Sequence, residues 1–139
     1  SPDGCTLYFS NSSEREILAF PYDAGIPDVG KPRLFTKITE AHGYPDGLAV
    51  DLDGCVWCAH WDGGGVSRFS PQGEFLQFFA LPIPRVTSCA FGGSDYEQLY
   101  ITTASWGLSN AQMQKSPLSG SLFVVTPGVK GMPSRAFLG

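Results

Sequence analysis

The sequence has few charged residues and no long apolar segment. Charged side chains make up 16% of the 139 residues, and the nine Lys and Arg residues are scattered. A nucleic-acid-binding protein usually shows a basic stripe, and this chain has none. Its apolar runs are far shorter than the roughly 20 residues with which a helix spans a bilayer. We therefore expect neither nucleic acid nor membrane as a partner.

Helical periodicity is also lacking. No segment repeats its apolar residues every three to four positions, which is the spacing that an amphipathic helix needs. What the chain has instead is 17 Gly, 11 Pro, 13% aromatic residues and 42% hydrophobic residues. This composition favours many short strands, joined by tight turns, around a packed core. We expect an all-β protein with almost no helix.

The four cysteines do not form the pattern of a disulfide framework or a zinc site. Cys55 and Cys58 read as C-x-x-C, but they lie in an expected strand, where positions i and i+3 point to opposite faces. There is no second pair with ligand spacing. We expect four unpaired, mostly buried thiols, which agree with a reducing cytoplasm. Export stays open, because Ser1 need not be the natural start.

A repeat organises the chain. Three segments begin with an aliphatic and then an aromatic residue, and they start 49 and 43 residues apart, at 7–11, 56–60 and 99–103. Periods of about 40–50 residues are typical of four-stranded propeller blades. The pattern predicts following strands at 17–20, 66–69 and 122–125, innermost strands at 47–50 and 88–91, and outer strands at 34–36, 75–79 and 134–137. Turn residues stand at 1–4, 51–54 and 70–73.

These strands predict a β-propeller with about three blades in this chain, approximately residues 1–40, 41–83 and 84–139. The first blade opens on the turn 1–4 without an innermost strand. Because a closed propeller needs at least about four blades, we expect a partner for this half-propeller. It would be either a missing N-terminal portion or a second copy in a homodimer. The opening in mid-blade favours the N-terminal portion.

Polar residues are predicted to gather at one mouth of the propeller channel. In antiparallel blades alternate connections fall on the same face, which brings together Asp46, His60, Trp61, Thr87 and the loop 105–120 with Trp106. That loop is 13 residues longer than its counterparts and would make a lid. A carboxylate, an imidazole, hydroxyls and two tryptophans suit a polar small molecule. The alternative is that these loops are merely polar and that the tryptophans pack between blades.

The motifs around Asp46 carry a family resemblance. Residues 45–51 read P-D-G-hydrophobic-x-hydrophobic-D, and they are followed by G-x-h-W-h-A and a glycine run; further matches lie at 87–93, 99–104, 120–123 and 128–131. In this order and spacing the chain resembles the C-terminal half of the SMP-30/gluconolactonase/regucalcin-like family. These proteins are six-bladed propellers, and the family comprises metal-dependent sugar-lactone and ester hydrolases.

The resemblance implies one divalent metal at the channel mouth, calcium foremost, with zinc, magnesium or manganese as alternatives. Asp46, in the P-D-G motif, is the only family ligand that falls in this chain. The resemblance implies it as a metal ligand. From its place at the channel mouth we hypothesise that it is also the catalytic residue, whose free oxygen accepts a proton from the attacking water. The other ligands and the substrate-binding arginine of the family lie outside this sequence. On its own chemistry, Asp46 also reads as a turn-forming aspartate before glycine.

Three further residues are candidates for substrate binding. His60 would contact substrate or carry a proton, or else form a structural hydrogen bond to a neighbouring blade. Trp61 and Trp106 would flank a sugar ring, or pack, as we expect of Trp57. His42 is expected in solvent. The function implied is hydrolysis of a small-molecule lactone or ester by metal-activated water. The alternatives are a non-catalytic calcium-binding or protein-interaction propeller, or an inactive fragment.

Overall fold

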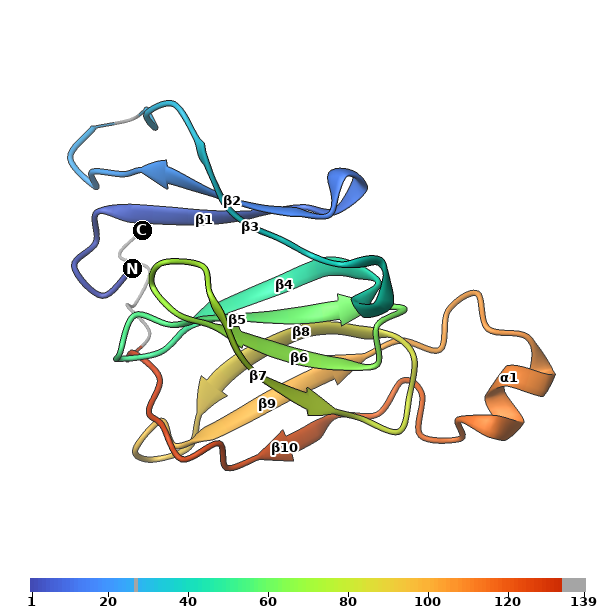
Figure 1. Ribbon diagram of the computed structural model, residues 1–139. Helices are drawn as coiled ribbons and strands as arrows, with labels where there is room; N and C mark the ends of the chain where they lie inside the picture. Colours follow the sequence, from blue (N-terminus) through green and yellow to red (C-terminus); the bar gives the residue numbers. More distant parts are fainter. Residues whose placement is uncertain (27, 134–139) are drawn as a thin grey trace.

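The computed structural model describes residues 1–26 and 28–133, and within them ten strands form three antiparallel sheets (Figure 1). Helix is confined to α1 (Asn110–Lys115) and to two 3-10 turns, η1 (Ser12–Glu14) and η2 (Glu40–His42). Both the all-β class and the scarcity of helix are therefore as predicted. The sheets lie beside one another, with the middle one between its two neighbours.

Each sheet contains consecutive strands that pair in chain order. The first has β1 (Thr6–Asn11), β2 (Glu16–Pro21) and β3 (Arg33–Lys37). The second has β4 (Tyr44–Val50), β5 (Val56–Trp61), β6 (Gly65–Phe69) and β7 (Phe75–Ala80). The third has β8 (Val86–Gly92), β9 (Gln98–Thr103) and β10 (Phe123–Val125). The strands predicted from the repeat are confirmed, except that the one at 134–137 lies outside the described residues.

The predicted turns close with backbone hydrogen bonds. The N–H of Gly4 donates to the carbonyl of Ser1 at 2.9 Å, that of Gly54 to Asp51 at 3.0 Å, and that of Gly73 to Ser70 at 2.9 Å. At Gly54 the backbone has φ +78, a left-handed conformation that glycine adopts without a steric penalty. The turn chemistry read from the sequence therefore sets where strands end.

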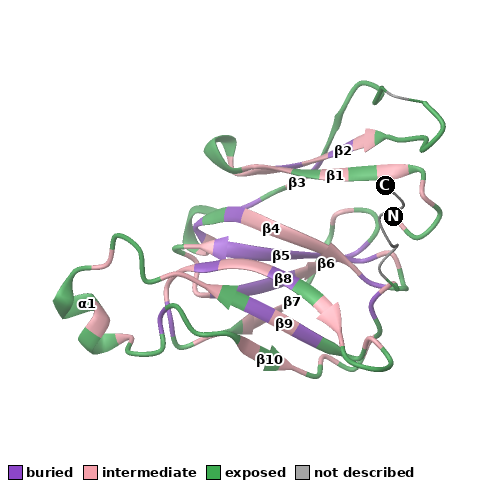
Figure 2. Ribbon diagram, turned by 180° about the vertical axis from the view of Figure 1, so that it is seen from behind, coloured by how far each residue is buried: buried purple, intermediate pink, exposed green. Residues whose placement is uncertain are grey.

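The core is divided into two layers by the middle sheet. Strand β5 is buried on both faces, because successive side chains point to opposite sides (Figure 2). Trp57 and Ala59 pack with the third sheet, whereas Val56 and Cys58 pack with the first, where Phe35 of β3 meets them. Trp57 is fully buried and contacts Phe79 and Phe91, which confirms its packing role. All four cysteines are free as predicted, three of them buried and Cys5 exposed.

A buried carboxylate anchors the turn between β4 and β5. Asp51 has no solvent exposure and accepts hydrogen bonds from the Cys55 N–H, from Trp57 Nε1 and from Arg68 Nε, each at 2.9 Å. Arg68 Nη2 lies 2.8 Å from the same carboxylate. The next residue, Leu52, donates its N–H to the carbonyl of Lys130 in the chain after β10. Asp51 therefore joins the turn, the core indole and β6, and its neighbour joins the third blade.

We predict that Asp51→Asn lowers the free energy of unfolding by about 3 kcal/mol, because it leaves a half-buried guanidinium without its main counter-charge. Asp53→Asn is the matched control. Asp53 also pairs with Arg68, but its side chain is 66% exposed, so we expect a loss below about 1 kcal/mol. Urea denaturation followed by tryptophan fluorescence measures both. Equal losses in the two variants would contradict the anchoring role of Asp51.

Candidate functional site

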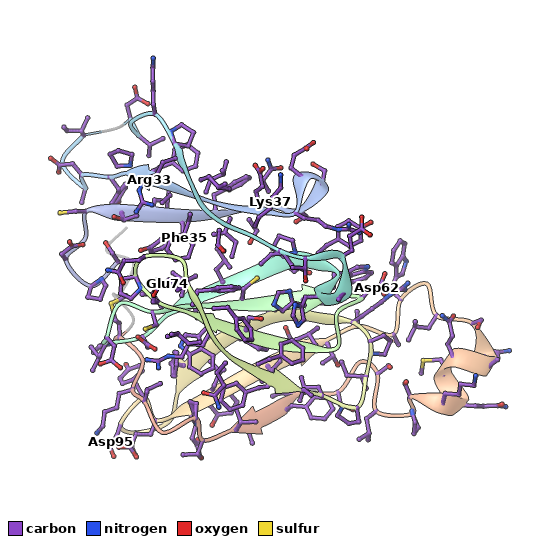
Figure 3. All side chains as sticks on the ribbon, in the orientation of Figure 1. Arg33, Phe35, Lys37, Asp62, Glu74 and Asp95 are labelled. Carbon is purple, nitrogen blue, oxygen red and sulfur yellow. The ribbon has the colours of Figure 1, made fainter. Side chains whose placement is uncertain are left out.

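The sheets bring the predicted site residues to one end. Tyr44 at the start of β4 pairs with Trp61 at the end of β5, and Val86 at the start of β8 pairs with Thr103 at the end of β9. The long loop 105–120, which contains α1, leaves from this end, opposite the N-terminus (Figure 1). Asp62, which follows β5, lies at the same end (Figure 3). We call this end the mouth.

The backbone around Asp46 is held by all three blades. From the first blade, Ser10 Oγ donates to the carbonyl of Asp46, and Ser12 Oγ donates to that of Pro45 at 2.7 Å. From the third blade, Ser88 packs so closely against Gly47 that a Cβ atom there would overlap its side chain. Glycine is therefore needed after Asp46 for close approach of β4 and β8. These contacts hold the backbone beside Asp46 between β1 of the first blade and β8 of the third.

The Asp46 carboxyl group is half-buried and has no basic neighbour. Burial raises the pKa of Asp46, and the backbone N–H of Gly47 offsets this in part. Among the described residues, no Lys, Arg or His forms an ion pair with it. Such a carboxylate fits one oxygen ligand of a hard cation. The described residues contain no group of three or more His, Cys, Asp or Glu that could hold a metal ion.

His60 lies inside the protein rather than at the mouth. Its side chain has no exposure, its Nε2 is 2.7 Å from Ser67 Oγ, and its ring lies 6.0 Å from that of Phe78. The physical reason is strand alternation: His60 is on the same side of β5 as Val56 and Cys58, which faces the first blade. In this chain the buried side chain offers no surface to a ligand. Its hydrogen bond runs to Ser67 of the same blade, whereas the sequence suggested a bond to a neighbouring blade. His42, expected in solvent, instead stacks on Phe75 with ring centroids 6.1 Å apart.

Trp61 and Trp106 come together at the mouth, although they are far apart in sequence. Their ring centroids are 6.3 Å apart at an interplanar angle of 51°, and Trp106 is 79% exposed. Arg85, which sequence reasoning missed, lies over the Trp61 ring at 4.8 Å and donates from Nε to Asp62 Oδ1 at 2.8 Å. Its position entering β8, as Asp46 enters β4, is the signal that could have identified it.

Three antiparallel sheets packed face to face, with the starts of β4 and β8 gathered at one end, make this chain part of a β-propeller. Residues 1–105 match the SMP-30/Gluconolactonase/LRE-like region, and the chain belongs to this family. None of the helices in residues 1–26 and 28–133 is long and apolar enough to cross a membrane.

The chain is similar to proteins about twice its length. It is 40% identical to regucalcin of Danio rerio over 141 residues, which covers 100% of this chain and 48% of that protein. The structure of the calcium-binding protein regucalcin from Agrobacterium tumefaciens is 33% identical, with a TM-score of 0.88 over 95% of this chain and 45% of that one. A gluconolactonase from Xanthomonas campestris is 33% identical, with a TM-score of 0.62 over 73% of this chain and 32% of that one. The chain thus spans about half the length of the curated relatives it matches.

The buried position of His60 predicts a pH-dependent stability. Burial, reinforced by the nearby His42, lowers the pKa of His60 from 6.5 to about 4, so the native imidazole stays neutral where the unfolded one takes up a proton. The free energy of unfolding should therefore fall as the pH is lowered from 6.5 towards 4, by up to about 3 kcal/mol from this residue. Urea denaturation of the wild type and of His60→Gln at pH 7.5 and 4.5 measures the difference.

His42→Gln serves as the control for this experiment. We expect the pH dependence to shrink in His60→Gln and to persist for the most part in His42→Gln, because burial, the main cause of the lowered pKa of His60, remains in that variant. A pH dependence that is unchanged in His60→Gln would show that other groups cause it.

Proposed function

We propose that this chain is half of a metal-dependent hydrolase that opens sugar lactones or related esters with metal-activated water. The observation that carries the proposal is Asp46. It is a half-buried carboxylate without a basic partner among the described residues, and all three blades hold its backbone at the mouth. Family membership and the likeness to a gluconolactonase support the reaction class.

Asp46 would serve this chemistry in two ways. One carboxylate oxygen would hold a divalent cation, calcium foremost, with zinc, magnesium or manganese as alternatives. A cation bound there supplies a Lewis acid for the lactone carbonyl. The second carboxylate oxygen would accept a proton from the attacking water. Burial raises the pKa of Asp46, which makes the group a stronger base than an exposed aspartate.

The two tryptophans of the mouth would bind the ring of the substrate. The exposed face of Trp106 and the neighbouring edge of Trp61 offer apolar surface to the C–H groups of a sugar lactone. His60 would contribute indirectly, because its buried hydrogen bond to Ser67 helps to hold the end of β5 from which Trp61 projects.

A calcium-binding propeller without catalysis is the second candidate. The likeness to regucalcin, which is described as a calcium-binding protein, favours it. Both candidates use Asp46 as a cation ligand, so only turnover separates them.

We predict that Asp46→Asn and Asp46→Ala lower lactone hydrolysis by the full-length protein at least about 100-fold, because each removes the proton acceptor. Calorimetric titration with calcium should show weaker binding, most clearly for Asp46→Ala. Glu14→Gln is the control, since Glu14 is an exposed carboxylate in a turn beside β4. Near-wild-type turnover with intact cation binding in either Asp46 variant would exclude the catalytic role.

The rest of the ring is the partner that we propose for this chain. On the face of the first blade that points away from the second, Leu7, Phe9 and Leu34 are 45%, 53% and 52% exposed. Strand β1 pairs only with β2 among the described strands, so one of its edges is also open. Apolar faces and open edges of this kind are usually covered. We propose that further blades of the same propeller cover them, from the same polypeptide or from a second copy.

We predict that Phe9→Asp destabilises the complete ring by about 2 kcal/mol or more, because it places a charge in the interface between blades. Leu76→Asp on β7 is the matched control: Leu76 is 48% exposed on an outer strand that the ring does not cover, and the change should cost under about 1 kcal/mol. Thermal unfolding of the natural protein measures both, and native mass spectrometry gives its size. A stable monomer of 14.9 kDa would contradict the proposal.

A further inference from the structure

Three segments from two blades meet at one arginine at the mouth. Arg85 lies between the turn after β5, the start of β8 and the long loop 105–120. We propose that Arg85 is a positioning residue that holds this loop over the mouth and thereby determines how tightly ligands bind there. The part of this inference that concerns ligands rests on the proposed function, whereas the part that concerns the loop does not.

The contacts of Arg85 join the end of the second blade to the start of the loop 105–120. Nε donates to Asp62 Oδ1 at 2.8 Å, Nη1 donates to the backbone carbonyl of Trp106, and the guanidinium covers the Trp61 ring. The carbonyl of Arg85 accepts the N–H of Ala104 at 3.0 Å, just before the loop. The side chain is only 15% exposed, and hydrogen bonds of a charged donor are stronger when they are shielded from water. One side chain therefore links both tryptophans to the end of the second blade.

The loop has little apolar packing of its own. Helix α1 has a capping box at Ser109 but buries none of its residues. At the base of the loop, Thr103 Oγ1 accepts the N–H of Gly120 at 3.0 Å and donates to the carbonyl of Ser121 at 2.6 Å. These bonds close the base of the loop on the Gly120 side. On the other side, Trp106 lies in a turn that the Leu108 N–H closes on the carbonyl of Ser105 at 3.2 Å. Arg85 is the side chain that joins this turn to Asp62 and Trp61 of the second blade.

The backbone of the loop passes close to the Arg85 side chain at Gly107. Gly107 has φ +72, and a Cβ atom at this position would come within 2.8 Å of Arg85 Nη1. Any side chain at Gly107 would therefore displace the guanidinium or the loop. Substitution of Gly107 perturbs the same contact from the opposite side, without removing the charge.

Asp62 neutralises Arg85, so we assign the arginine a geometric role and not a role in charge stabilisation at the reacting atoms. When the contact to Trp106 is lost, the turn that carries Trp106 can move away and the 6.3 Å spacing of the two indoles is no longer maintained. Such a change weakens the binding of ligands that lie against the tryptophans. It does not touch Asp46, so the chemical step should be largely preserved.

The first test is spectroscopic and needs no activity. In the full-length protein, the circular dichroism band that arises from coupling of Trp61 and Trp106 is identified as the band lost in Trp106→Phe. We expect Arg85→Ala and Gly107→Ala to lose more than about half of this band, because each breaks the contact that holds Trp106. Lys130→Ala is the control, since Lys130 pairs at 2.8 Å with Glu97, which precedes β9 at the end opposite Thr103 and the mouth. A full band in both Arg85→Ala and Gly107→Ala overturns the proposal.

The second test is kinetic, with glucono-δ-lactone as the probe. We expect Arg85→Ala to raise KM about tenfold and to change kcat less than about threefold, whereas a residue at the reacting atoms would lower kcat. Arg85→Lys should resemble Arg85→Ala, because an ammonium group does not reproduce the planar fork that joins Asp62 to Trp106. A large fall in kcat with an unchanged KM overturns the positioning role.

The two tests separate the failure of this inference from the failure of the proposed function. A wild-type protein that hydrolyses no lactone would remove the lactonase proposal, and the dichroism band would still decide whether Arg85 holds the loop. If Arg85→Ala does not fold, the dichroism bands of Arg85→Lys and Gly107→Ala decide whether Arg85 holds the loop.

Discussion

The buried carboxylate of Asp51 anchors the middle blade, and the arrangement of its neighbours depends on this anchor. It holds the indole of Trp57 by a hydrogen bond at 2.9 Å, and Trp57 is the largest fully buried side chain in the layer against the third blade. The same carboxylate binds Arg68, which lies 5.7 Å over the Trp57 ring. Because a buried charge is tolerated only when it is paired and hydrogen-bonded, this network has one favourable geometry. The orientation of β5 between two blades follows from it.

Because β5 is buried on both faces, a blade packs on each side of the second blade. This packing brings together strand ends that are about 40 residues apart in the repeat, and the mouth forms there. The second blade packs against β1 on one side and against β8 on the other, so the starts of β4 and β8 are brought together. At that point Ser10 donates a hydrogen bond to the carbonyl of Asp46, and Ser88 lies too close to Gly47 for a side chain there. These contacts hold the backbone from which the carboxyl group of Asp46 projects. The packing of the apolar layers thus positions the polar residues of the mouth.

The two halves of the mouth differ in how they are held. Asp46 belongs to a strand that is packed between blades, whereas Trp106 belongs to a loop held by hydrogen bonds and one ion pair. Regions with few buried apolar contacts open at a lower free energy than the core. In the proposed function, a carboxylate on a packed strand and a tryptophan on a loop held by polar contacts would suit a site that admits and releases its ligand.

Much of this structure could be predicted from the sequence, because the signals are local. Aliphatic–aromatic strand starts, turn residues at 51–54 and 70–73, and the alternation of side chains determine the strands, the pairing order and the four free thiols. The placement of Asp46, Trp61 and Trp106 at one end follows from antiparallel pairing alone. The tertiary structure decided that His60 turns inward, that Asp51 is an anchor, and that Arg85 joins Asp62 to Trp106 across 23 and 21 residues. Those outcomes depend on which face of a strand a neighbouring blade covers and on partners distant in the chain, and no local pattern of residues encodes either.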